Sequence, residues 1–267
     1  TNKQYAAMKL TLYLLLGSAF MFAAFLYMYS MPGSGTFDLI AIKQNVIFSL
    51  LEQKVLFLGL FVGFGVLAAC FPFHVWSPEG HMAAPPAASM LHAGVLMKLG
   101  TFGILRVAVY LFPEGAKFWA PLMAGLALCN IVYGSLVATQ QKDIKFMIGY
   151  SSVSHMGIVL LGISTLSETG INGALFQMFA HGIMTALFFA CVGHIYDQIH
   201  TRQFDEMGGL SKQAPIISAF FIIAGLCGLG LPGMGAFIAE LLVTIAAIHV
   251  FPVIGVISIV ALLVTAY

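Results

Sequence analysis

The sequence predicts an all-α fold, a polytopic transmembrane helical bundle with two discontinuous helices. Of its 267 residues, 60% are hydrophobic and only 8% are charged, and the mean hydropathy is +0.99. The hydrophobic residues gather in runs of about 20, the length that crosses a bilayer as a helix. These runs lack the alternation that the strands of a membrane β-barrel require. Proline and glycine interrupt two of them.

The N-terminal half contains three predicted spans. The first covers residues 8–31 and ends at a Pro-Gly-Ser-Gly turn. Residues 37–54 mix charged and apolar side chains, which favours a loop with a short interfacial helix. The second span covers residues 55–71 and is interrupted at Pro72, and the third covers residues 87–111.

Three further spans follow along the chain. They are predicted over residues 118–138, from the charged corner at 140–145 to about residue 166, and over residues 172–196. Pro113 and Pro121 mark the turn before the first of these, because proline lacks a backbone donor and disrupts a helix interior. The polar residues 197–214 form the one long loop of the prediction.

The last part of the chain contains the second predicted break. Residues 215–250 form an apolar segment of about 36 residues, which would be more than about 50 Å long as a single helix. The sequence Gly-Leu-Gly-Leu-Pro-Gly-Met-Gly at residues 228–235 divides this segment into two half-helices. A final span begins near Pro252. Backbone that unwinds at membrane depth must lie within protein or line a wet cavity, so both breaks point to the interior.

Lys98 lies near the centre of the span over residues 87–111. A lysine at the centre of a bilayer costs about 2.5–3.5 kcal/mol on insertion scales. An ionisable residue at that depth is therefore interpreted as functional unless its side chain reaches an interface. Lys98 is too central for that, whereas Arg106 is close enough to the end of the span. The alternative is that Lys98 is neutralised or paired merely to join helices.

Four other ionisable residues accompany Lys98 within or at the edge of apolar runs: His155, His181, Glu240 and Lys145. Protons suit these groups, because histidine titrates near neutral pH and a buried lysine or glutamate is driven toward its neutral form. Sodium would require more carboxylates or a ring of carbonyls. Central ionisable groups beside interrupted helices are typical of secondary transporters built from inverted repeats. A simple hydrogen bond to a neighbour is the alternative for the histidines.

Several other classes of site are disfavoured. The cysteines stand singly in apolar runs without Cys-x-x-Cys spacing, so they are predicted to be small core residues: Cys70, Cys129, Cys191 and Cys227. No glycine pattern of a nucleotide-binding loop is present, and a net charge of +1 predicts no nucleic-acid partner. Three histidines flank the first break and are interpreted as loop or interface groups: His74, His81 and His92.

The distribution of positive charge predicts the orientation in the membrane. If the spans alternate in direction, one face collects Lys3, Lys9, Lys142, Lys145, Arg202 and Lys212. The opposite face has Lys43, Lys54 and Lys117, with Arg106 near it. The first face is therefore predicted to be cytoplasmic, because cytoplasmic loops are enriched in lysine and arginine.

Five motifs in order resemble one known family. They are FPFHVWSPEGHMAAPPAASMLHAGVLMKLG, QKDIKFMIGYSSVSHMG, FQMFAHGIMTALFF, YDQIHTRQFDEMGGL and LGLPGMGAFIAE. They are similar to the antiporter-like membrane subunits of respiratory complex I, NADH:quinone oxidoreductase. The similarity is greatest to the M-type subunit and its relatives in Mrp sodium/proton antiporters and membrane-bound hydrogenases. It extends over nearly all of residues 71–240.

The resemblance implies a role for each buried ionisable residue. It makes Lys98 the central lysine of the family's eighth helix, and His155 and His181 the histidines of the tenth and eleventh helices. Lys145 becomes the lysine at the cytoplasmic start of the tenth helix, and Glu240 the glutamate of the broken twelfth. A glutamate rather than a lysine at that last position favours the M type.

The resemblance also implies a domain organisation and shows one departure from the family. Residues 1–267 would form a single antiporter-like domain, with residues 1–111 ending a first repeat and residues 118–267 forming a second. The chain would be a fragment that holds helices six to thirteen. The family usually has a lysine seven residues before the histidine of its PFHxW motif, and counting back from His74 gives Leu67. One entry group of the family's proton path is therefore absent.

The predicted function is proton translocation by a membrane subunit of a complex I-type redox-driven pump, in a bacterial-type inner membrane. Lys98 would be the central relay, the two buried histidines would bridge it through water to Glu240, and Lys145 would tune the path or connect it to the cytoplasm. The expected partners are other membrane subunits, lipid and protons, and no cofactor is expected on this chain. A non-pumping scaffold, which Leu67 supports, and an Mrp-type cation/proton antiporter subunit are the alternatives. A free-standing solute carrier is disfavoured because nothing marks a substrate pocket.

Overall fold

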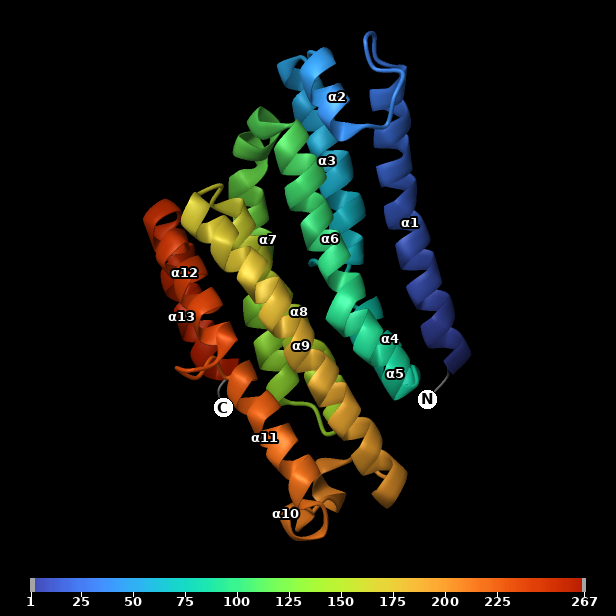
Figure 1. The fold of residues 1–267 in the computed structure, drawn as a ribbon, viewed down its shortest axis with the longest axis vertical. Coiled ribbons are helices and arrows are strands. Elements are labelled where there is room, and N and C mark those ends of the chain that lie inside the picture. Colours follow the sequence, from blue (N-terminus) through green and yellow to red (C-terminus); the bar gives the residue numbers. More distant parts are fainter. Residues whose placement is uncertain (1–2, 266–267) are drawn as a thin grey trace.

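The predicted all-α fold is confirmed. The computed structural model describes residues 3–265, and within them the chain is helical apart from turns and one isolated β-bridge between Asp143 and Gln203. The long helices run side by side along the long axis of the molecule (Figure 1). Six of them are long and apolar enough to cross a membrane: α1 (Lys3–Ser30), α3 (Leu50–Leu67), the continuous run Pro86–Val109, α7 (Pro113–Thr139), α8 (Ile144–Ser164) and α9 (Glu168–Ile199).

Shorter helices complete the part of the chain that the structure describes. The run Pro86–Val109 comprises α5 (Pro86–Leu91), the π-helix η1 (His92–Leu96), α6 (Met97–Gly103) and the π-helix η2 (Ile104–Val109). The others are α2 (Leu39–Asn45), α4 (Trp76–Ala83), the 3₁₀ turn η3 (Phe204–Glu206), α10 (Leu210–Gln213), α11 (Pro215–Gly228), α12 (Gly235–Val250) and α13 (Pro252–Thr265).

The first interruption lies earlier in the chain than predicted. A capping box starts α3: the Ser49 hydroxyl accepts from the Glu52 N–H, and the Glu52 carboxylate accepts from the Ser49 N–H. The helix ends at Leu67, where Cys70 N donates to Gly65 O at 2.8 Å, in a Schellman motif with Ala69 in the left-handed region. The predicted span over residues 55–71 was therefore wrong at both ends by about one turn.

Pro121 does not mark a turn, contrary to the prediction. It lies inside α7, which begins at Pro113. Proline is well tolerated in the first turn of a helix, where its missing N–H has no intrahelical partner in any case. Within the helix it removes one backbone hydrogen bond. Buried residues on either side, Ala120 and Met123 among them, hold this part of α7 against its neighbours.

Buried polar side chains satisfy the unwound backbone after α3. Asn130, on α7, accepts from Phe71 N at 2.5 Å and donates to Ala69 O at 3.1 Å. The indole N–H of Trp76 donates to Val66 O at 2.8 Å. The polar groups of this segment are thus paired within protein, as backbone at membrane depth requires.

α11 ends in the same way as α3. Leu231 N donates to Leu226 O at 3.2 Å and Gly230 N to Cys227 O at 3.1 Å, with Gly230 at a φ of +61°. In both places proline follows the left-handed residue within three positions. Whether α3–α4 and α11–α12 each form one membrane crossing, as halves of inverted repeats, stays a prediction.

α8 lies at the centre of the bundle. Most of its residues are buried, with α7, α9, α4 and α12 packed around it. The approach of α7 to α8 depends on glycine, since a Cβ at Gly134 would come within 2.7 Å of Ser154 N. α1, at one side of the bundle in Figure 1, buries only 11% of its apolar window and packs on α3 and α4. The start of α1 and α10 lie at one end of the molecule, and α2 lies at the other end (Figure 1).

Candidate functional site

Lys98 lies directly after the π-helix η1 and is buried, with 8% of its surface exposed. Its ammonium group donates to Ala93 O and lies 2.5 Å from Nδ1 of His181, on α9. The two helices approach closely here, since a Cβ at Gly182 would come within 3.0 Å of Gly94 O and 3.9 Å of Lys98 Cε. Small residues on both helices therefore bring the lysine to the histidine.

His181 and His155 form the next contact. Their ring centroids lie 5.1 Å apart, with His181 on α9 and His155 on α8, and both side chains are buried. Nε2 of each ring is buried without a hydrogen-bond partner among the described residues. Buried polar atoms in proteins nearly always have a partner, so these two nitrogens stand out among the described residues.

Glu240 completes the row of polar side chains. Its Oε1 lies 3.4 Å from His155 Nδ1, and its side chain is 12% exposed. Gln177, on α9, bridges the pair: its Nε2 lies 3.2 Å from His155 Nδ1 and 3.3 Å from Glu240 Oε1. Gly230 lies against the other carboxylate oxygen. Thus the second break holds the carboxylate against the histidine.

Together these contacts form one continuous row from α6 through α9 and α8 to α12. In order the side chains are Lys98, His181, His155, Gln177 and Glu240. Four of the five were candidates from the sequence, whereas Gln177 was missed. Its position four residues before His181 puts both on one helical face, which was the one available signal.

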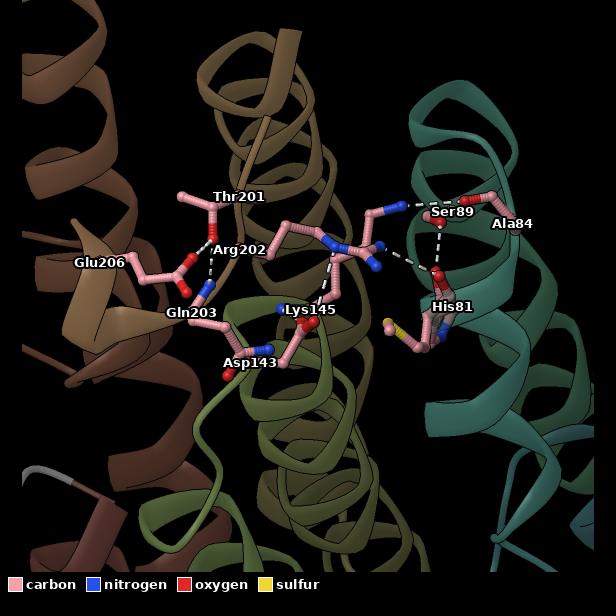
Figure 2. Close-up of polar contacts among 10 residues, drawn as sticks. His81, Ala84, Ser89, Asp143, Lys145, Thr201, Arg202, Gln203 and Glu206 are labelled. Atoms are coloured by element: carbon pink, nitrogen blue, oxygen red, sulfur yellow. Dashed lines mark hydrogen bonds and ion pairs between the residues drawn. The ribbon is translucent and has the colours of Figure 1, made fainter. Parts of the chain in front are cut away.

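Lys145, the fifth candidate, lies apart from the row at the start of α8. It is 4% exposed, and its ammonium group donates to Ala84 O at the α4–α5 junction at 2.8 Å. Asp143 caps α8 by accepting from Lys145 N at 2.8 Å, and its other oxygen lies 3.5 Å from Nε of Arg202. Figure 2 shows Lys145 and Arg202 pointing toward the same end of α4.

His81 is buried inside the bundle, and the prediction that it is a loop or interface group was wrong. It is on α4 with 0% of its surface exposed, and its ring packs on Phe189 and His92 with centroids 5.1 and 6.1 Å away. Neither ring nitrogen has a partner among the described residues. The sequence hid this burial because α4 is short and polar.

A second polar cluster lies on the other side of the first interruption. Lys9, on α1, forms an ion pair with Glu79 of α4 at 2.7 Å. His74 is buried nearby, contrary to its interpretation as a loop group, with its ring 4.8 Å from that of Tyr133. Leu67 is the last residue of α3. A cationic side chain thus reaches the first interruption from α1.

No group of three or more His, Cys, Asp or Glu side chains among residues 3–265 is arranged to hold a metal ion. The fold and the site together define the class of protein: a polytopic helical membrane protein with a buried row of Lys, His and Glu. The chain belongs to the NADH:quinone oxidoreductase/Mrp antiporter transmembrane family, whose model matches residues 1–265.

Relatives and solved structures agree with this membership. The chain is 43% identical over 242 residues to "NADH-quinone oxidoreductase subunit M" of Rickettsia prowazekii, covering 90% of this chain and 49% of the relative. It is 42% identical to "NAD(P)H-quinone oxidoreductase chain 4 2" of Trichodesmium erythraeum, covering 91% and 43%. A chain of respiratory complex I from Thermus thermophilus superposes with a TM-score of 0.93 at 30% identity, covering 98% and 56%. The chain therefore spans about half the length of these relatives.

Proposed function

We propose that this chain translocates protons as a membrane subunit of a complex I-type redox-driven pump. The observation that carries the proposal is the row from Lys98 to Glu240, which connects four helices through the interior. Each ionisable member lies within one contact, or one water, of the next. That spacing allows protons to pass between donors and acceptors, and it is what a relay requires.

The chemistry of each group supports a distinct step. Lys98 and His181, 2.5 Å apart, share one proton rather than holding two charges in a medium of low dielectric. His155 then passes a proton from Nδ1 to Glu240 Oε1, 3.4 Å away, and the Gln177 amide holds that carboxylate oxygen in place by donating to it at 3.3 Å. The two imidazoles, with ring centroids 5.1 Å apart, supply the middle step.

Lys145 and His81 form the cytoplasmic end of the proposed path. Lys145 is buried beside a cavity at that end of the bundle, and the buried His81 ring packs on Phe189 of α9 and on His92 of η1. A membrane potential contributes about 2.3 kcal/mol per charge per 100 mV. Modest changes in the proton affinity of neighbouring groups are therefore enough to drive a proton along the row.

Protons suit this site better than sodium. Glu240 is the one carboxylate in the row, and a sodium ion needs several oxygen ligands. We propose as the setting an energy-conserving, bacterial-type inner membrane, with other membrane subunits as partners and redox chemistry on other subunits, and the similarity to subunits of NADH-quinone oxidoreductase and respiratory complex I supports this setting. These assignments, like the roles of the site residues, are part of the proposal.

The test is the number of protons pumped per electron in vesicles that hold the intact complex. Lys98→Ala and Glu240→Gln are compared with Lys212→Ala, an exposed lysine on α10 outside the site. We expect the ratio to fall in the first two variants, with assembly and electron transfer measured in parallel. An unchanged ratio in fully assembled Lys98→Ala would instead establish a non-pumping scaffold. Sodium dependence of transport would establish the antiporter alternative.

A further inference from the structure

The cavity beside Lys145 is lined by positive side chains from three separate parts of the chain. Its volume is about 400 Å³, and it lies between the start of α1, the α4–α5 junction and the end of α9. Lys3, Lys145 and Arg202 line it, together with Ala84, Tyr196 and Asp197. The cavity is thus a concentration of positive charge at one end of the bundle.

The nearby acids leave this charge only partly compensated. Asp143 lies 3.5 Å from Arg202 and also caps α8, so it is already engaged. Asp197 is on the exposed last turn of α9. Lys145 is 4% exposed, and its ammonium group donates to a neutral carbonyl, Ala84 O, at 2.8 Å. A buried ammonium group that donates to a neutral carbonyl, in a cavity that two further cationic side chains line, is suited to an anionic ligand.

An adjoining cleft, mainly apolar and with His92 in its lining, lies between α1 and α4. Its volume is about 330 Å³, and it shares Lys3, Ala83, Ala84 and Pro85 with the basic cavity. From there it continues between α1 and α4, along Ala6, Ala7, Leu10, Thr11 and Gly80. A basic cavity at the end of membrane-spanning helices therefore leads directly into a narrow apolar cleft.

We propose that this composite site binds an anionic phospholipid, with its phosphate headgroup in the basic cavity and one acyl chain in the cleft. Basic pockets between transmembrane helices on the cytoplasmic side suit anionic headgroups, since that leaflet carries the negative lipid. The cleft distinguishes a lipid from a soluble phosphate, because only the lipid buries apolar surface there. The lipid would tie α1 to α4 and α8 at this end of the bundle.

The test measures lipid binding to the full-length protein within its purified complex, after delipidation in neutral detergent. Phosphatidylglycerol, phosphatidylcholine and inorganic phosphate are added separately, and native mass spectrometry and thermal stability report binding. We expect phosphatidylglycerol to bind and to raise the melting temperature, and the other two to do neither. Equal binding of phosphatidylcholine, or full stabilisation by inorganic phosphate alone, would overturn the proposal. Neither readout requires turnover, so the result is independent of proton pumping.

Two variants separate the two parts of the site. Lys3→Gln removes a charge from the cavity, and the matched control Lys212→Gln removes one from α10 at the same end. A lysine near an anionic lipid surface contributes about 1 kcal/mol, so Lys3→Gln should weaken phosphatidylglycerol binding about five-fold. Ala7→Phe fills the cleft and should also weaken phosphatidylglycerol binding, because the acyl chain loses its place between α1 and α4. Affinities equal to the control in both variants would refute the site.

Discussion

The residues of the row differ in how readily the sequence reveals them. Lys98 and Glu240 stand out because a charge within an apolar run is costly unless it has a use. Gln177 and His81 do not, since an amide or an imidazole in a helix is unremarkable until the facing helix is known. Gln177 belongs to the row only because the face of α9 that carries it packs against His155 and Glu240. The sequence predicts the charged members, whereas the packing identifies the polar ones.

Gln177→Leu tests whether the amide is part of the path. The variant removes the bridge between His155 and Glu240 while keeping similar volume. We expect fewer protons pumped per electron, because the carboxylate loses the group that holds it toward the imidazole. Gln198→Leu, near the exposed end of the same helix, is the matched control. A ratio for Gln177→Leu that equals the control would show that the amide is dispensable.

Asn130→Leu tests the support of the first interruption. The variant leaves Phe71 N and Ala69 O without their side-chain partner, and each unpaired buried group costs about 1–3 kcal/mol. The melting temperature of the complex should fall. Ser135→Ala is the control on the same helix, since that hydroxyl bonds only to carbonyls of its own helix. Equal melting temperatures for the two variants would mean that the interruption relies on other contacts.

At the level of elements, a boundary is predictable where a residue with a special conformation marks it. The break over residues 228–235 was predicted from its glycines and proline, and in the structure Gly230 adopts the left-handed conformation that closes α11. The end of α3 was misplaced because Ala69 occupies the equivalent position, which alanine adopts rarely. Pro121 was predicted to mark a turn, but α7 stays helical around it because tertiary packing holds the helix. Hence local propensity decides boundaries only where packing does not override it.

Gly230→Ala tests the coupling between the second break and the carboxylate. A Cβ at this left-handed position costs about 1–2 kcal/mol in backbone strain and collides with Glu240 Oε2. The carboxylate must then move away from His155, so both stability and pumping should decrease. Gly225→Ala, on α11 with open space around it, should change neither. Normal pumping in Gly230→Ala would show that the carboxylate tolerates displacement.

At the level of the whole molecule, composition predicts the class and the number of long spans, but not which helices meet. Lys98 and Glu240 are far apart in sequence and are connected only because α8 lies at the centre, with α9 and α12 packed on it. The Lys9–Glu79 ion pair joins α1 to α4 and is not part of this row. The spacing of these residues along the sequence does not indicate which helices pack together. The sequence therefore predicted the candidates individually but not the order in which they contact one another.

The orientation of the bundle can be predicted from charge and tested directly. In Figure 1 the N-terminus and α10 lie at one end and α2 at the other, which matches the division of loops that places most lysines and arginines on one face. We expect that face to be cytoplasmic.

In a variant without Cys70, Cys129, Cys191 and Cys227, Lys212→Cys should react with a membrane-impermeant maleimide only in inside-out vesicles. Lys117→Cys, on the exposed start of α7, should react only in right-side-out vesicles. The reverse pattern would invert the path, with Lys145 at the outer surface and protons entering from the opposite side. Labelling of both positions from one side would contradict the bundle itself, because it would put the two ends of the molecule on the same face of the membrane.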